Sequence, residues 1–179
     1  GNLGEATLQA AVYSPILDLL ADHQSRTLGQ MEQAVTAQGI SFAQVLQAVM
    51  VLTGSGALQA VQDDITASKA KKQTGKLNTC LIDKARSSGD ISYLASPVTG
   101  GGVTLSRFQQ LFLLARSQGK KQPAEWAAFV WQLLAAQNQK IVKEGKTLET
   151  AEENLAELTA QAQPFAEKQL PILQALQIV

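Results

Sequence analysis

Apolar residues recur every three or four positions through most of this 179-residue chain, which constrains its fold more than any other feature. Residues with that spacing lie on one face of an α-helix, so the sequence predicts a mainly helical protein. The composition agrees, because alanine, glutamine and leucine are abundant and aromatic residues make up only 5%. The expected helices cover residues 4–22 with a restart at Ser14-Pro15, 29–38, 42–52, the second half of 63–90, a stretch around 108–115, 123–144, 150–165 and a last turn from Pro171.

Two short segments alternate or extend in the manner of β-strands, Ala57–Val61 and Ile91–Leu94. Their order after the first helices is that of a winged-helix domain, with a long helical excursion between the two strands. We therefore expect a mainly α protein with a small β-hairpin. Residues 1–98 would form a winged-helix-like subdomain with a long helical wing, and residues 99–179 a C-terminal helical subdomain packed on it.

The net charge of zero is the sum of three unlike segments. Residues 1–62 carry one basic residue against four acidic ones, 63–121 carry ten against four, and 122–179 carry four against seven. A basic middle between acidic flanks indicates a polarised surface rather than a uniformly basic nucleic-acid-binding protein.

No combination of residues typical of a catalytic or metal site stands out. One cysteine, Cys80, excludes an internal disulfide framework, and one histidine, His23, excludes a histidine-rich metal site. We expect Cys80 to be a small buried apolar residue and His23 to be a cation at a helix C-terminus. Ser68 and Lys71 match S-x-x-K, but the motifs that accompany that pattern in nucleophilic enzymes are absent.

Two glycine-containing stretches invite comparison with phosphate-binding loops. Thr99–Gly102 precedes a predicted helix, where backbone N–H groups can hold a phosphate, and Gly145–Thr147 resembles the end of a Walker A loop. Neither has the remaining glycines at the required spacing, which favours turns. We expect no cofactor and no metal in this chain.

A lysine-rich segment and two neighbouring features form the candidate interaction surface. Phosphates or a partner of acidic character could bind there, although a lysine run is more often simply a solvated face. The candidate residues are Lys69, Lys71, Lys72, Lys76, Lys84, Arg86, Thr99, Gly100, Gly101, Gly102 and Trp131. Trp131 belongs to this set because it is five residues from Trp126, which is expected to face the core, so the two side chains cannot share one narrow helix face. Trp131 therefore needs cover from the other subdomain or from a partner, unless both tryptophans are ordinary core residues.

The predicted helix 42–52 would be the DNA-reading helix of a winged-helix domain, yet it contains no cation. Only Gln44 and Gln47 could bond a base, and phosphates are normally held by lysine and arginine. DNA binding by a winged-helix transcriptional regulator is therefore the alternative function, and a structural oligomerisation module is a third.

No run reaches the roughly 18 consecutive apolar residues that a membrane span needs, and no signal-peptide pattern opens the chain, so we expect a cytoplasmic protein. The chain starts with Gly1 rather than methionine, which we interpret as a piece of a longer protein.

Several stretches resemble a known family: Ile91–Val103 (ISYLASPVTGGGV) with Arg107–Phe112 (RFQQLF), Lys143–Leu158 (KEGKTLETAEENLAEL) and Leu170–Leu173 (LPIL). They look like the C-terminal part of prokaryotic class I S-adenosylmethionine-dependent methyltransferases that carry a methyltransferase regulatory domain. Rickettsial-type protein lysine methyltransferases are similar. The resemblance covers about residues 12–178, and its specific part is confined to 91–178.

That resemblance implies a regulatory or substrate-positioning domain that is not itself catalytic. S-adenosylmethionine would bind the catalytic domain of the parent polypeptide, since this chain opens without the strand, glycine loop and helix that hold it. The implied partners are that catalytic domain, a protein substrate and a second copy of the chain, whereas nucleic acid is disfavoured. No catalytic residue is transferred.

Overall fold

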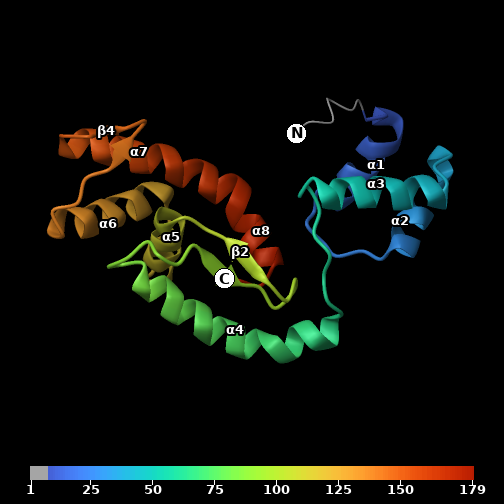
Figure 1. Cartoon of the computed structure of the whole chain (residues 1–179), viewed down its shortest axis with the longest axis horizontal. Helices are drawn as coiled ribbons and strands as arrows, with labels where there is room; N and C mark the ends of the chain where they lie inside the picture. The colour runs from blue at the N-terminus through green and yellow to red at the C-terminus, as the bar shows by residue number, and fades with distance from the viewer. Residues whose placement is uncertain (1–7) are drawn as a thin grey trace. The chain divides into compact units, whose positions relative to one another are not determined.

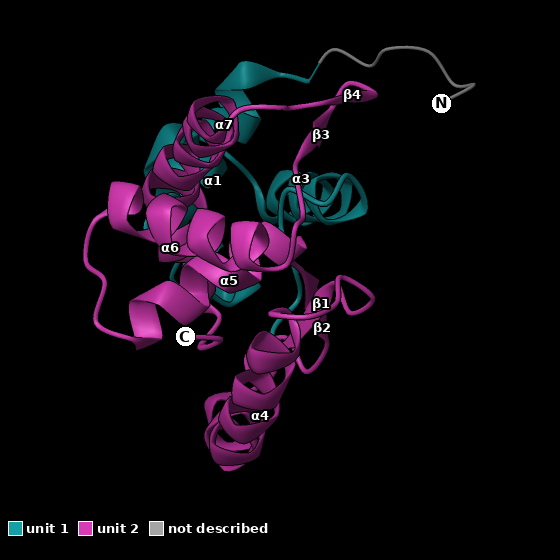
Figure 2. Cartoon of the chain, turned by 90° about the vertical axis from the view of Figure 1, so that its left-hand side faces the viewer, with its two compact units in different colours: residues 1–61 teal, residues 62–179 magenta. Residues whose placement is uncertain are grey.

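The computed structural model describes residues 8–179, and Figure 1 shows that helices dominate them. The chain divides into unit 1, residues 1–61, and unit 2, residues 62–179 (Figure 2). The expected mainly α fold with a small β-hairpin is confirmed. The boundary expected between residues 98 and 99 falls inside unit 2, in the turn that joins the two strands of one hairpin.

Unit 1 is a small helical unit. Its elements are α1 (Ala10–Leu20), α2 (Leu28–Val35), a 3-10 turn (Thr36–Gln38) and α3 (Phe42–Gly54). Capping boxes start two of them, at Thr27 with Gln30 and at Ser41 with Gln44. The buried core consists of Val12, Ile16, Met31, Val35, Ile40, Val45, Ala48 and Leu52.

The expected restart of the first helix at Ser14-Pro15 is wrong, because α1 runs through Pro15 without a break. Proline removes only one helical hydrogen bond there, and burial of Val12 and Ile16 on either side holds the helix together. Residues 4–7 of the expected helix lie outside the described residues.

The expected strand at Ala57–Val61 is also wrong. The partner of β1 (Tyr93–Ala95) is β2 (Gly102–Thr104), in an antiparallel register that sets Leu94 opposite Val103. Closing a short turn costs less chain entropy than closing a long excursion, which favours the local partner. This hairpin lies wholly in unit 2, residues 62–179.

Unit 2 is built around helix α5. Its elements are α4 (Asp64–Lys84), the β1–β2 hairpin, α5 (Arg107–Ser117), α6 (Pro123–Ala136), β3 (Val142–Lys143), β4 (Lys146–Thr147), α7 (Ala151–Pro164), a π-helical turn (Phe165–Gln169) and α8 (Leu170–Ala175). Residues 110–115 of α5 are all buried, so α4, α6 and α7 cover this helix on several sides.

The hairpin β3–β4 replaces the last part of the helix expected over 123–144. Helix α6 ends at Ala136 because the four residues that follow are polar and no longer supply an apolar face. The two turn residues Glu144 and Gly145 both adopt positive φ, 50° and 79°. Paired left-handed residues are the geometry that two-residue hairpins require.

A buried asparagine holds this hairpin against α7. Asn154 Oδ1 accepts from the backbone N–H of Ile141 at 2.8 Å, and its Nδ2 donates to the carbonyls of Leu148 and Thr150. Its side chain therefore has partners for both its donor and its acceptor groups, so the buried polar side chain stabilises the fold rather than weakening it.

Acidification should destabilise the start of α7. The backbone N–H of Thr150 donates to the Glu153 carboxylate, which lowers the pKa of this group below its ordinary value of 4.5. A carboxylate with a lowered folded-state pKa stabilises the fold above its unfolded pKa, and this stabilisation is lost as the pH falls through the folded pKa. We expect Glu153→Gln to weaken the pH dependence of the melting temperature below pH 4.5, because glutamine keeps an acceptor but does not titrate.

The control is Glu152→Gln in the same helical turn, since the Glu152 carboxylate accepts no hydrogen bond from the described residues. Thermal melts at a series of pH values measure the pH dependence of the melting temperature for the parent chain and both variants. Identical pH profiles for the parent and Glu153→Gln would contradict the assignment.

Candidate interaction surface on helix α4

Helix α4 has one buried face and one fully solvated face. Ala67, Asn78 and Ala85 are buried, and they mark the side that packs against β1 and α5. With about 3.6 residues per turn, Lys69, Lys72 and Lys76 fall in one line on the opposite side. We call these three residues the lysine row.

The lysine row is free of compensating charge. All three side chains are exposed, and none forms an ion pair or a side-chain hydrogen bond with any described residue. The N-terminal acids of the helix do not reach them, since Asp63 instead caps the helix by accepting from the N–H and hydroxyl of Thr66. Three solvated cations in one line give this face of unit 2 a positive potential.

The other expected cations do not belong to that surface. Lys71 and Lys84 are exposed but lie on other sides of α4. Arg86 follows the helix, and its Nε donates to Asp83 Oδ1 at 2.7 Å. The lysine-rich segment is therefore divided in space, and only the lysine row forms one face.

The turn Thr99–Gly102 is occupied by its own hydrogen bonds. The N–H groups of Val98 and Thr99 donate to Ser96 Oγ, that of Gly100 donates to the Ser96 carbonyl, and that of Gly101 donates to Thr99 Oγ1. Gln62 also packs against this turn, so closely that a Cβ at Gly100 would meet its Nε2 at 2.3 Å. The N–H groups of residues 98–101 are all engaged, so they are not available to hold a phosphate.

The remaining singled-out residues have ordinary surroundings. Trp126 is buried in the core of unit 2, and Trp131 is half-buried against the same core, so it needs no cover from outside this unit.

Cys80 was expected to be buried, but it is exposed because it faces away from β1 and α5 on the solvated side of α4. His23 follows α1 with a φ of 60°, and its N–H donates to the carbonyl of Leu20.

Helix α3 carries no charged residue, as the sequence indicated, and an apolar row is exposed along it. Phe42, Leu46 and Met50 are 44%, 38% and 67% exposed. Val45, Ala48 and Leu52 are its buried residues, and Val49 packs against the same core. This row carries no lysine or arginine to bind DNA phosphates.

The buried amide side chains of Asn78 and Gln110 in unit 2 form hydrogen bonds with backbone groups. Asn78 Oδ1 accepts from the N–H of Ala95, and its Nδ2 donates to the carbonyls of Ala95 and Ile178. Gln110 Nε2 donates to the carbonyls of Ile91 and Leu105. Among residues 8–179 no group of three or more histidine, cysteine or acidic side chains is placed to hold a metal ion. Both buried amides thus donate to backbone carbonyls, while Gln110 Oε1 accepts from none of the described residues.

Sequence reasoning missed the residues that join α4 to the rest of unit 2. Arg107 is one of them: its Nε donates to the carbonyl of Ala85 and its Nη2 to that of Arg86, so it satisfies carbonyls at the end of α4. Asn78 is the other. Its position within an apolar stripe was a usable signal, because a polar residue there must find partners.

Comparison with known proteins gives one informative relative. The chain is similar to an uncharacterized protein of Synechocystis sp., with 37% identity over 176 residues. The match covers 98% of this chain but only 34% of the relative, so the chain spans about a third of that protein's length. No family model matches the chain, and no solved structure matches it significantly. In the part of the chain that the structure describes, no helix is both long enough and apolar enough to cross a membrane.

Proposed function

We propose that this chain is a non-catalytic recognition domain within a longer protein, and that its lysine row binds an acidic segment of a protein. The observation that carries the proposal is the line formed by Lys69, Lys72 and Lys76, exposed and without ion-pair partners among the described residues. Long-range attraction to an acidic surface raises the association rate, and a partner bound there leaves the core packing undisturbed because the row lies opposite the packed face of α4.

The longer protein is, in this proposal, an S-adenosylmethionine-dependent methyltransferase, protein lysine methyltransferases included. The resemblance of residues 91–103 and 143–158 to the C-terminal part of such enzymes supports it, as does the greater length of the Synechocystis relative. The domain would position an acidic protein substrate or contact the catalytic domain. S-adenosylmethionine would bind outside residues 1–179.

Charge reversal tests the lysine row. With Lys69, Lys72 and Lys76 all changed to glutamate, we expect binding of fluorescent poly-L-glutamate to weaken at least about tenfold, because three attractive charges become repulsive. Fluorescence anisotropy at several salt concentrations measures it, and the affinity of the parent chain should fall as salt rises. The control reverses Lys120, Lys146 and Lys168, which are equally exposed and make the same change in net charge elsewhere on unit 2.

Two outcomes would contradict the proposal. Equal loss in the control would mean that net charge alone drives binding. Tighter binding of duplex DNA than of poly-L-glutamate, lost on reversal of the row, would favour the DNA-binding alternative instead. The methyltransferase part is tested separately: the longer protein should bind S-adenosylmethionine, and failure to do so would remove that part while leaving the lysine row untouched.

A further inference from the structure

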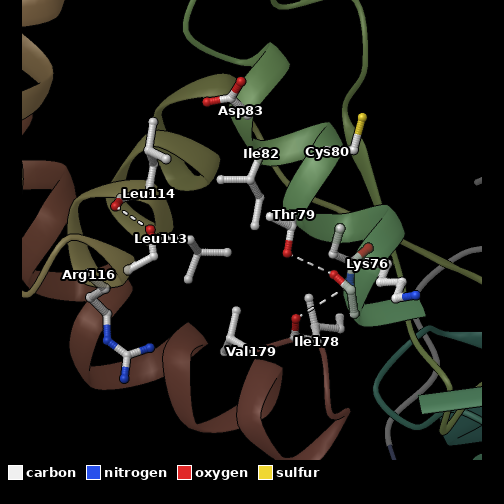
Figure 3. A pocket seen from close by; sticks show the side chains of 13 residues that line it. Lys76, Thr79, Cys80, Ile82, Asp83, Leu113, Leu114, Arg116, Ile178 and Val179 are labelled. Carbon is white, nitrogen blue, oxygen red and sulfur yellow. Dashed lines mark hydrogen bonds between the residues drawn. The ribbon is translucent and has the colours of Figure 1, made fainter. Parts of the chain in front are cut away.

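A pocket of about 690 Å³ opens in unit 2 between α4, α5 and the segment that follows α8. Figure 3 shows the side chains of Ile82, Leu113, Ile178 and Val179 directed into one open space. Small-molecule sites in proteins typically have volumes of about 300–1,000 Å³. The space is therefore large enough for a ligand and is more than a packing defect.

The walls of this pocket offer apolar contact and few free hydrogen-bonding groups. The hydroxyl of Thr79 donates to the carbonyl of Gly75, and that of Ser117 donates to the carbonyl of Leu114. The amide of Asn78 is engaged with Ala95 and Ile178. With these three polar side chains already paired, the body of an occupant meets mainly apolar surface there.

The edge of the pocket carries one cation that is available to a ligand. Figure 3 places the Arg116 guanidinium at one edge of the space, whereas the Lys76 amine points away from it. Arg116 forms no ion pair or side-chain hydrogen bond with the described residues. Asp83, the acidic side chain of the lining, forms its ion pair with Arg86 and not with Arg116.

We infer that this pocket binds a small amphiphile with an unbranched apolar chain and a carboxylate head, of the kind a medium-chain fatty acid presents. The chain contacts Ile82, Leu113 and Ile178, and the head lies on the Arg116 guanidinium, whose planar fork suits a carboxylate. This site and the lysine row share only Lys76, which lines the pocket but directs its amine away from the space, whereas Lys69 and Lys72 are not part of the lining.

Isothermal titration of the 179-residue chain with sodium decanoate below its micelle concentration tests the site. We expect saturable binding, about tenfold weaker for Arg116→Gln because the charged hydrogen bonds to the head are lost. Ile82→Trp should abolish binding by filling the space, and Thr79→Trp, at an exposed position of the same wall, should weaken it. The control Lys146→Gln removes one positive charge from an exposed position of β4, outside the pocket lining, and should change nothing.

Circular dichroism melts confirm that each variant is folded, and Thr79→Trp remains decisive if Ile82→Trp unfolds the chain. Decanol, which keeps the chain and lacks the charge, should bind less tightly than decanoate. The inference is overturned by absence of saturable binding, by equal affinities for decanol and decanoate, or by equal effects of Arg116→Gln and Lys146→Gln.

Discussion

Replacing Phe165 with alanine should lower the free energy of unfolding by about 4 kcal/mol, the largest effect expected of a single substitution in this chain. Phe165 is 2% exposed and lies between two other aromatic rings of the unit 2 core. Its ring centroid is 5.6 Å from that of Phe112 and 6.2 Å from that of Trp126, with the latter pair edge to face. Removing the ring loses apolar burial and both aromatic contacts, and leaves a cavity.

Urea unfolding followed by circular dichroism measures this change, and Trp126 fluorescence provides a local probe of the same site. The matched control is Phe42→Ala on α3, where the same atoms are removed from a side chain that is 44% exposed, so a change below about 1 kcal/mol is expected. Comparable losses for the two variants would show that Phe165 is not a centre of the core.

Replacing Asn78 with leucine should cost about 3 kcal/mol although the side chain keeps its branched shape and its number of heavy atoms. The N–H and carbonyl of Ala95 each bond the Asn78 amide at 2.8 Å, so this side chain pairs with β1 much as a neighbouring strand would. Leucine leaves both backbone groups without these partners on the buried side of α4, and a buried unpaired polar group costs more than its hydrogen bond contributes.

Urea unfolding gives the stability change, and hydrogen exchange of the Ala95 amide gives its local origin. Exchange of that amide should accelerate more than exchange of amides in α7. Thr79→Val is the control on the adjacent residue, because the Thr79 hydroxyl bonds only the Gly75 carbonyl of its own helix. If Asn78→Leu were as stable as the parent chain, the contact between α4 and β1 would have to rest on apolar packing alone.

Local signals in the sequence identified most helices. Ser41 and Thr150 each begin a helix with a capping box, as their sequence context indicates, and Gly39 ends the helical segment before α3 with a φ of 78°. These features depend on residues within one turn of each other, so they can be read without knowing the tertiary partners.

Strand pairing could not be read in this way. The segments 57–61 and 93–95 look similar as isolated sequences, and only the turn at 96–101, closed by its own hydrogen bonds, decides that β1 pairs with β2. The hairpin at 142–147 was hidden for a related reason, since Glu144 reads as a helix-forming residue until Gly145 and the packing of Ile141 place it in a turn.

For the candidate sites too, some features follow from the sequence alone and others only from the tertiary structure. The sequence determined that the chain is mainly helical, that α3 carries no charge and that lysines cluster along 69–84, because these follow from residue types and short spacings. Only the tertiary structure decided which lysines share a solvated face, that the N–H groups of the turn at 98–101 are already engaged, and that Arg116 borders an apolar pocket. The first and the last of these depend on which residues distant in sequence are brought together, and the burial that selects those neighbours is a property of the whole folded unit. The second depends on the backbone conformation of the turn, which sets Ser96 and Thr99 against its N–H groups.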